Sequence, residues 1–188
     1  MKLNSLLLGV FLCLVNLVQA QLNSTVHDKE IESLIDKMTI EEKVGQMTQI
    51  TLDVITKGED IYSSYEPFEL DQDSLNKALV DYHIGSVLNT ANNRALTPQK
   101  WYSLISQIQE TALNDRLEIP VLYGVDMIHG ATYTVGATMF PQQIGQAATR
   151  NRDLVRRGAE VTAYETRASS ISWNFSPVLD LGMDPRFP

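Results

Sequence analysis

The chain has 188 residues and is acidic, with 23 Asp and Glu against 15 Lys and Arg and a formal net charge of −8. This balance argues against nucleic acid and against an anionic membrane surface as partners, because both require a basic face. A chain of this length ordinarily forms one domain.

Residues 1–20 have the layout of a signal peptide. Lys2 gives a short positive start, Leu6 to Val18 is apolar, and Val18-Gln19-Ala20 places small residues at the two cleavage-recognition positions. The apolar run is shorter than the ~20 residues of a membrane span. We therefore expect cleavage after this motif, a periplasmic or secreted protein with no membrane attachment, and a domain over residues 21–188.

Two helices are predicted near the start of that domain. Apolar residues at one helical face, from Ile31 to Met38, indicate the first. Thr39 and Glu42 form a Thr-x-x-Glu capping box that opens the second, whose apolar stripe continues to Met47. Residues 51–72 show no sustained periodicity and predict a surface loop.

Three short apolar runs predict strands, and helices lie before or between them. The expected strands are Ile84–Leu88, Val121–Val125 and Trp173–Leu179, and the expected helices are Leu75–Tyr82 (opened by Asp71 or Asp73), Thr97–Ala112 (with Pro98 in the first turn) and about Asn151–Ala168. Strands that alternate with helices form a parallel sheet. The fold class is therefore α/β, either an open doubly wound sheet or the opening third of a barrel.

Asp126 is the leading candidate for a ligand contact. It follows the second predicted strand directly, and both α/β architectures bind ligands at the carboxyl ends of their strands. A carboxylate there can accept hydrogen bonds from two sugar hydroxyls. An Asp after a strand can equally be a loop or helix cap. His129 and Gly130 follow in the same loop as possible supporting residues.

Other titratable residues give weaker signals. Asp180 and Asp184 suit a capped turn better than a metal site, since no His or Cys lies near them in sequence. Glu165 and Arg167 are two apart in a predicted helix, so they point in different directions and form no catalytic pair. No Gly-x-Gly-x-x-Gly or phosphate-binding loop supports a nucleotide cofactor. We expect neither a metal nor a cofactor.

Four segments together resemble the amino-terminal part of glycoside hydrolase family 3, in the branch that holds bacterial periplasmic β-glucosidases and plant exo-acting glucan hydrolases. They are, in chain order, Met38–Met47, Tyr123–Gly130, Gly136–Pro141 with Ala147–Arg150, and Ser176–Asp180 with Asp184–Arg186. They occur in the family's order and span nearly all of the mature chain, which makes the joint match specific.

The resemblance implies a (β/α)₈ TIM-type barrel, with this chain as its opening portion of N-terminal helices and about three parallel strands. It implies hydrolysis of terminal β-D-glucosyl residues with retention, without a cofactor, on β-glucosides or β-glucan oligosaccharides. In that family the aspartate of the Gly-Val-Asp segment binds hydroxyls of the non-reducing glucose, and Asp126 occupies this position. Arg186 is read as structural.

The resemblance also implies that the two catalytic carboxylates lie beyond residue 188. Three strand-helix units cannot close an eight-stranded barrel. We therefore expect this sequence to be the amino-terminal fragment of a longer enzyme, inactive by itself.

Two alternatives stay open. A non-catalytic sugar-binding module of periplasmic-receptor type would also be exported and acidic. A family 3 enzyme could instead act on β-xylosides or N-acetylglucosaminides, although the Gly-Val-Asp-Met-Ile-His-Gly form favours glucosides.

Overall fold

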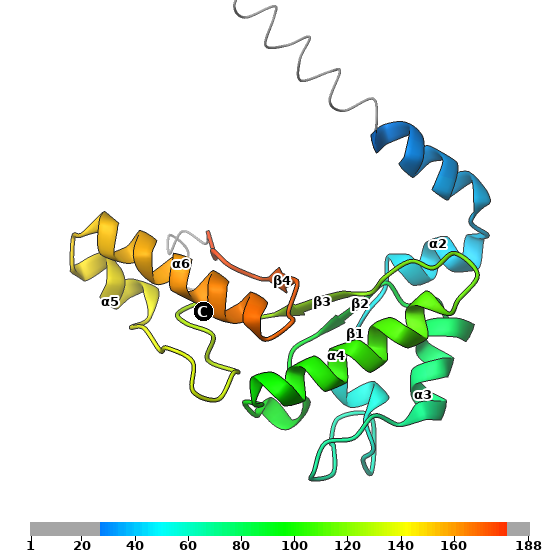
Figure 1. Ribbon diagram of the computed structural model, residues 1–188, viewed down its shortest axis with the longest axis horizontal. Helices are drawn as coiled ribbons and strands as arrows, with labels where there is room; N and C mark the ends of the chain where they lie inside the picture. Colours follow the sequence, from blue (N-terminus) through cyan, green and yellow to red (C-terminus); the bar gives the residue numbers. More distant parts are fainter. Residues whose placement is uncertain (1–26, 180–188) are drawn as a thin grey trace, which may run out of the picture. The chain divides into compact units, whose positions relative to one another are not determined.

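The computed structural model describes residues 27–179 (Figure 1). The expected signal segment, residues 1–20, lies outside them, as do Asp180, Asp184 and Arg186. After a helix over residues 27–37, the elements are α2 (Ile40–Gln46), β1 (Gln49–Thr51), the 3₁₀ turn η1 (Leu52–Ile55), α3 (Gln72–Asn76), the π-helical turn η2 (Lys77–Asp81), β2 (Ser86–Leu88), the 3₁₀ turn η3 (Ala91–Asn93), α4 (Pro98–Leu113), β3 (Leu122–Val125), α5 (Gln143–Ala148), α6 (Arg152–Ala168) and β4 (Trp173–Asn174).

The strands form one sheet in the order β1-β2-β3-β4, with every pair parallel. The predicted adjacency of the three later strands is confirmed, and so is the α/β class with a partial parallel sheet. The expected number of about three strands was low by one. β1 escaped prediction because its three residues, Gln49, Ile50 and Thr51, contain one apolar side chain and no alternation that a sequence pattern can use.

β4 is shorter than the predicted Trp173–Leu179. Its pairing with β3 joins Gly124 to Trp173 and Val125 to Asn174. One further bond runs from the Phe175 amide to the Val125 carbonyl, 3.2 Å away. Pro177 follows two residues later and has no N–H to continue the ladder, which accounts for the early end.

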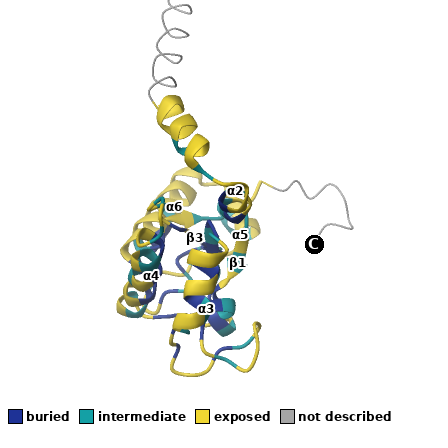
Figure 2. Ribbon diagram, turned by 90° about the vertical axis from the view of Figure 1, so that its right-hand side faces the viewer, coloured by how far each residue is buried: buried dark blue, intermediate teal, exposed yellow. Residues whose placement is uncertain are grey.

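The core lies between the sheet and α4. Val87, Tyr123 and Val125 project from one face of the sheet and are fully buried. α4 runs beside them (Figure 1) and contributes the ring of Trp101, which meets the Tyr123 ring edge-on at 5.8 Å between centroids. Figure 2 shows the buried positions around β3 and on one side of α4. The predicted start of α4 is confirmed, since the Thr97 side chain accepts the Lys100 amide.

The segment 51–72 was predicted to be a surface loop, which is wrong in part. Leu52, Ile55, Phe68 and Leu70 are all buried in the core. Leu52 and Ile55 face inward from the short turn η1, and Phe68 and Leu70 from irregular chain, so neither pair extends into a period that a sequence pattern could show. At its end Asp71, one of the two predicted caps, accepts the Ser74 amide and opens α3.

The helices after β3 differ from prediction by one element. α6 begins, as predicted, after Asn151, whose side chain accepts the Leu154 amide. α5 was not predicted, since its six residues are too few to show a period. Within residues 27–179, none of the helices is long and apolar enough to cross a bilayer.

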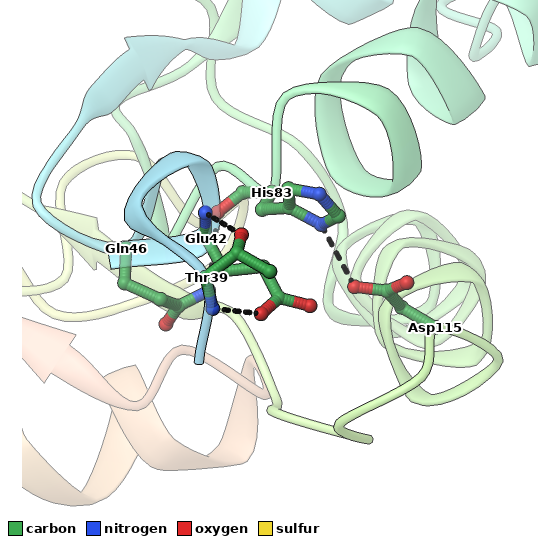
Figure 3. A network of polar contacts seen from close by, with 5 residues as sticks. All are labelled: Thr39, Glu42, Gln46, His83 and Asp115. Atoms are coloured by element: carbon green, nitrogen blue, oxygen red, sulfur yellow. Dashed lines mark hydrogen bonds and ion pairs between the residues drawn. The ribbon is translucent and has the colours of Figure 1, made fainter. Parts of the chain in front are cut away.

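The predicted capping box before α2 is confirmed (Figure 3). The Thr39 amide donates to the Glu42 carboxylate at 2.7 Å, and the Glu42 amide donates to the Thr39 hydroxyl at 3.2 Å. This reciprocal pair satisfies two amides at the start of the helix that have no partner within it.

A separate polar contact lies at the amino ends of the strands. His83 Nδ1 is 3.0 Å from Asp115 Oδ2, and the Gln46 amide donates to the His83 carbonyl at 3.1 Å (Figure 3). Because His83 precedes β2 and Asp115 follows α4, this pair lies at the opposite end of the sheet from Asp126. The His83–Asp115 contact therefore helps to join neighbouring elements at this end and takes no part in a site at the carboxyl edge.

Candidate functional site

Asp126 directly follows β3, at the carboxyl edge of the sheet, where the sequence predicted it. Its side chain is half-buried and makes no hydrogen bond or ion pair with any residue in the range 27–179. It therefore caps no turn or helix among these residues, which was the structural alternative. A carboxylate in this position has its oxygens available for hydroxyl or amide donors from a ligand.

The backbone on both sides of Asp126 is fixed. The Met127 amide donates to the Val125 carbonyl at 3.0 Å, which forms a tight turn around Asp126. The same amide is 3.0 Å from Asn174 Oδ1, and Asn174 Nδ2 donates to the Met127 carbonyl at 3.1 Å. The Asp126 loop is thus attached to β4 as well as to β3.

Gly124 lets the two strands approach at this point. A Cβ atom there would lie 2.4 Å from the Phe175 ring, so any larger residue would displace that ring. The close approach that Gly124 permits is thus made by the Phe175 side chain. Phe175 in turn packs edge-on against Trp173 at 4.7 Å between centroids.

His129 fastens the loop that carries Asp126. Its Nδ1 is 2.8 Å from the Phe140 carbonyl, and its Nε2 is 2.9 Å from the Gln142 side-chain nitrogen. A carbonyl only accepts, so Nδ1 carries a proton and donates to Phe140. The Phe140 amide also donates to the His129 carbonyl at 2.7 Å. Both ring nitrogens are thus occupied by the loop itself.

Gly130 is required by the same loop. Its φ is +114°, a backbone conformation that residues with a side chain rarely adopt. A Cβ there would also lie 2.1 Å from the Thr138 carbonyl oxygen. The supporting role of His129 and Gly130 in a sugar site stays a prediction.

Glu165 also serves this loop. Its two carboxylate oxygens accept from the Thr138 amide and the Thr138 hydroxyl, each at 2.9 Å. Because both oxygens are engaged, Glu165 ties α6 to the loop and is poorly placed to act as a nucleophile or acid. The sequence argument that Glu165 and Arg167 form no catalytic pair agrees with this geometry.

Asn89 and Thr90 follow the end of β2 and were not among the candidate site residues predicted from the sequence. Asn89 Oδ1 and Thr90 Oγ1 are buried and have no hydrogen-bond partner among the residues that the structure describes. The main-chain amide of Asn89 donates to the Gly124 carbonyl at 2.9 Å, which places Asn89 and Thr90 beside the end of β3. Their position directly after a strand was the available signal, the same one that identified Asp126.

A cavity of about 340 Å³ lies behind the Asp126 loop, between that loop, α6 and β4. His129, Phe140, Thr162 and Asn174 are among its lining residues, and Asp126 is not. The cavity is therefore lined by the residues that follow Asp126 and not by its carboxylate. Over residues 27–179, no three His, Cys, Asp or Glu side chains lie close enough together to share a metal ion.

Residues 39–188 match the family model described as the glycosyl hydrolase family 3 N-terminal domain. The chain belongs to glycosyl hydrolase family 3. This match covers the capping box, all four strands and the whole Asp126 loop, so the resemblance drawn from the motifs is confirmed.

Relatives in this family are similar along most of the chain. The lysosomal β-glucosidase of Dictyostelium discoideum is 33% identical over 169 residues, which are 86% of this chain and 20% of that protein. The periplasmic β-glucosidase of Salmonella typhimurium is 29% identical over 166 residues, which are 88% of this chain and 18% of that protein. The chain thus spans about a fifth of the length of these relatives.

A solved structure supports the fold. The exo-1,3/1,4-β-glucanase of a Pseudoalteromonas species superposes with a TM-score of 0.62 at 32% identity, covering 79% of this chain and 17% of that one. Other matched relatives are named for β-N-acetylglucosaminidase or β-xylosidase activity together with β-glucosidase activity.

Proposed function

We propose that this chain forms the first part of the sugar-binding site of an exo-acting, retaining β-glucosidase, with Asp126 binding the terminal β-D-glucosyl residue. The observation that carries the proposal is the half-buried Asp126 carboxylate at the carboxyl edge of the sheet, unpartnered within residues 27–179. Family membership, and relatives named as β-glucosidases, support glucosides as the substrate class.

The chemistry of a carboxylate suits this role. Each of its oxygens can accept a hydrogen bond from a sugar hydroxyl, and bonds to an ionised acceptor are roughly twice as strong as neutral ones. Two neighbouring hydroxyls can therefore be held by one side chain. The fixed backbone at Val125 and Met127 supports the proposal, because a preoriented acceptor loses little freedom when the sugar binds.

The reaction itself needs residues beyond this chain. A retaining glycosidase uses two carboxyl groups about 5–5.5 Å apart, one as nucleophile and one as acid and base. The family resemblance implies that both lie after residue 188. We therefore propose that the 188-residue chain alone does not turn over a β-glucoside, and that activity belongs to a longer protein.

We also propose export to the periplasm or the cell exterior. The signal-peptide pattern of residues 1–20 supports it, and so do relatives named as periplasmic enzymes. Amino-terminal mass spectrometry of exported protein should show Gln21 as the first residue. An intact Met1 on exported protein would contradict the proposal.

The second candidate function is hydrolysis of β-xylosides or N-acetylglucosaminides by the same site, which the names of two relatives favour. The longest natural protein that contains this sequence should be assayed on the 4-nitrophenyl β-glycosides of glucose, xylose and N-acetylglucosamine. The highest kcat/KM is expected for the glucoside. A protein that binds glucose and hydrolyses none of the three would support the sugar-binding module instead.

The deciding experiment is Asp126→Ala in that longest natural protein. Loss of two charged hydrogen bonds, each contributing about 1.5–3 kcal/mol, should lower kcat/KM by roughly 10²- to 10⁴-fold. Asp60→Ala is the matched control, because Asp60 is an exposed carboxylate whose bonds stay within residues 60–63. Wild-type activity of a folded Asp126→Ala protein would overturn the proposed function.

A further inference from the structure

We propose that Asn174 is a positioning residue for Asp126: its side chain holds the backbone of the next residue, Met127, and so fixes the orientation of the sugar-binding carboxylate. This inference rests on the function proposed for Asp126. It goes further by assigning a part of that function to a residue on the neighbouring strand, far away in the sequence.

The side chain of Asn174 makes a two-point contact with one backbone unit. Its Oδ1 accepts from the Met127 amide at 3.0 Å, and its Nδ2 donates to the Met127 carbonyl at 3.1 Å. The amide thus pairs with the residue after Asp126 much as a neighbouring strand would. An amide is suited to this contact because it carries one acceptor and one donor side by side.

The main chain beside Asn174 holds the residue before Asp126. Asn174 is the register partner of Val125 in the parallel pairing of β3 with β4. The next amide along the chain, that of Phe175, donates to the Val125 carbonyl at 3.2 Å. Both neighbours of Asp126 are therefore held from this segment, Val125 by the Phe175 main chain and Met127 by the Asn174 side chain.

Asp126 itself has no side-chain partner within residues 27–179. Its orientation is consequently set by the backbone on either side of it. Nothing else in the described part of the chain bonds to the Met127 backbone apart from the Val125 carbonyl and Asn174. Loss of the Asn174 amide would leave the Met127 carbonyl without a partner and would free the loop to shift relative to β4.

A shift of this kind has a chemical consequence. Misplacement of a binding group by about 1 Å can lower a rate on the order of 10²-fold, even when the group itself is unchanged. We therefore expect Asn174→Ala to act through Asp126, and to lower kcat/KM by about 10- to 100-fold. Asn174→Asp keeps the acceptor for the Met127 amide but sets a carboxylate oxygen against the Met127 carbonyl, so a loss at least as large as that of Asn174→Ala is expected.

Asn174 also begins the sequence Asn174-Phe175-Ser176, which matches the N-glycosylation pattern. Carbohydrate would be attached at Nδ2, the atom that donates to the Met127 carbonyl. A half-buried amide engaged at both of its polar atoms is a poor acceptor in the folded protein. The contact with Met127 therefore accounts for this side chain better than modification does.

The test is a double-mutant cycle in the longest natural protein that contains the chain. kcat/KM for a chromogenic β-glucoside is measured for the wild type, Asn174→Ala, Asp126→Ala and the double variant, with circular dichroism to verify folding. If Asn174 acts through Asp126, its replacement lowers kcat/KM in the wild-type background and by less than about threefold in the Asp126→Ala background. Asn76→Ala, at an exposed position in α3, serves as the control substitution.

Each outcome bears on a different proposal. An equal loss in both backgrounds would show that Asn174 acts independently of Asp126, and would overturn this inference while leaving the proposed function intact. Wild-type activity of Asp126→Ala would overturn both. If Asn174→Ala does not fold, the cycle is run with Asn174→Asp, and additivity there overturns the inference in the same way.

Discussion

The Tyr123 hydroxyl donates a hydrogen bond to the Asn89 carbonyl, 2.8 Å away, from a side chain that is fully buried. The Asn89 amide returns a bond to the Gly124 carbonyl at 2.9 Å. The carboxyl ends of β2 and β3 are thus tied together by side chain and main chain, just before Asp126. Burial raises the pKa of Tyr123 well above its usual value, and the charge of Asp53 adds to this.

Tyr123→Phe should make the stability of the protein less sensitive to alkaline pH. Because folding raises the pKa of Tyr123, its stabilising effect is complete below the unfolded value of about 10 and is lost as pH rises above it. At neutral pH the substitution should cost about 1 kcal/mol, the value of a lost hydrogen bond. Urea unfolding at about pH 8 and pH 10.5 measures both effects, with the exposed Tyr164→Phe as control. If the free energy of unfolding fell as much between about pH 8 and pH 10.5 in Tyr123→Phe as in the wild type, Tyr123 would not be the source of the pH dependence.

Much of the fold was predictable because its signals are local. The capping residues Thr39, Thr97 and Asn151 each bond to an amide three positions away, so a short sequence window contains both partners. β2 and β3 were found because each has a short apolar run with buried residues, Val87 in one and Tyr123 and Val125 in the other. β1 and α5 were missed because neither is long enough to display a period, and tertiary contacts alone define them.

The sequence pointed to Asp126 as a candidate site residue, with His129 and Gly130 in the same loop. The position of Asp126 was predictable because the end of a strand is visible in sequence and lies at the ligand-binding edge of a parallel sheet. Asn174 was not, because its bonds to Met127 join residues 47 positions apart. The same holds for Glu165, whose partner Thr138 lies 27 positions earlier. No sequence pattern reports which distant backbone a polar side chain will meet.

Gly130→Ala should destabilise the protein more than Gly136→Ala. Both glycines have positive φ, +114° and +85°, so both substitutions strain the backbone by about 1–3 kcal/mol. At Gly130 the added Cβ also meets the Thr138 carbonyl at 2.1 Å, whereas nothing lies within 4 Å of one at Gly136. The free energies of unfolding of the two variants give the comparison directly. Equal losses would mean that the loop moves to accommodate the new methyl group.

Glu165→Ala should reduce stability and leave the chemistry of the longer protein nearly unchanged. Both carboxylate oxygens of Glu165 are bonded to Thr138, and replacing them should cost about 1 kcal/mol of unfolding free energy. Its kcat/KM should stay within a few-fold of wild type, in contrast to Asp126→Ala. A loss of turnover without loss of stability would return Glu165 to the list of catalytic candidates.

The stability of the segment between β1 and α3 should depend far more on Asp53 than on Asp60, although both carboxylates lie in this segment. Asp53 Oδ1 accepts from the Ser64 hydroxyl at 2.7 Å and from the Asn92 amide at 3.2 Å, so it joins three distant parts of the chain. Within residues 27–179 the Asp60 carboxylate accepts only from the amide of Tyr62 and the hydroxyl of Ser63, two close neighbours in the sequence.

Asp53→Ala should therefore lower the free energy of unfolding by about 1–3 kcal/mol, because it strands two partly buried donors. Asp60→Ala should change it by about 0.5 kcal/mol or less, as surface substitutions usually do. Asp53→Asn keeps the Oδ1 acceptor and removes the charge. It should retain most of the stability and bring the pKa of Tyr123 closer to its usual value, since the Asp53 charge is one cause of the rise. Urea unfolding and ultraviolet titration of tyrosine measure the two quantities. If Asp53→Asn lowered the free energy of unfolding as much as Asp53→Ala does, the charge of Asp53, and not its hydrogen-bond geometry, would hold the segment between β1 and α3 to η3.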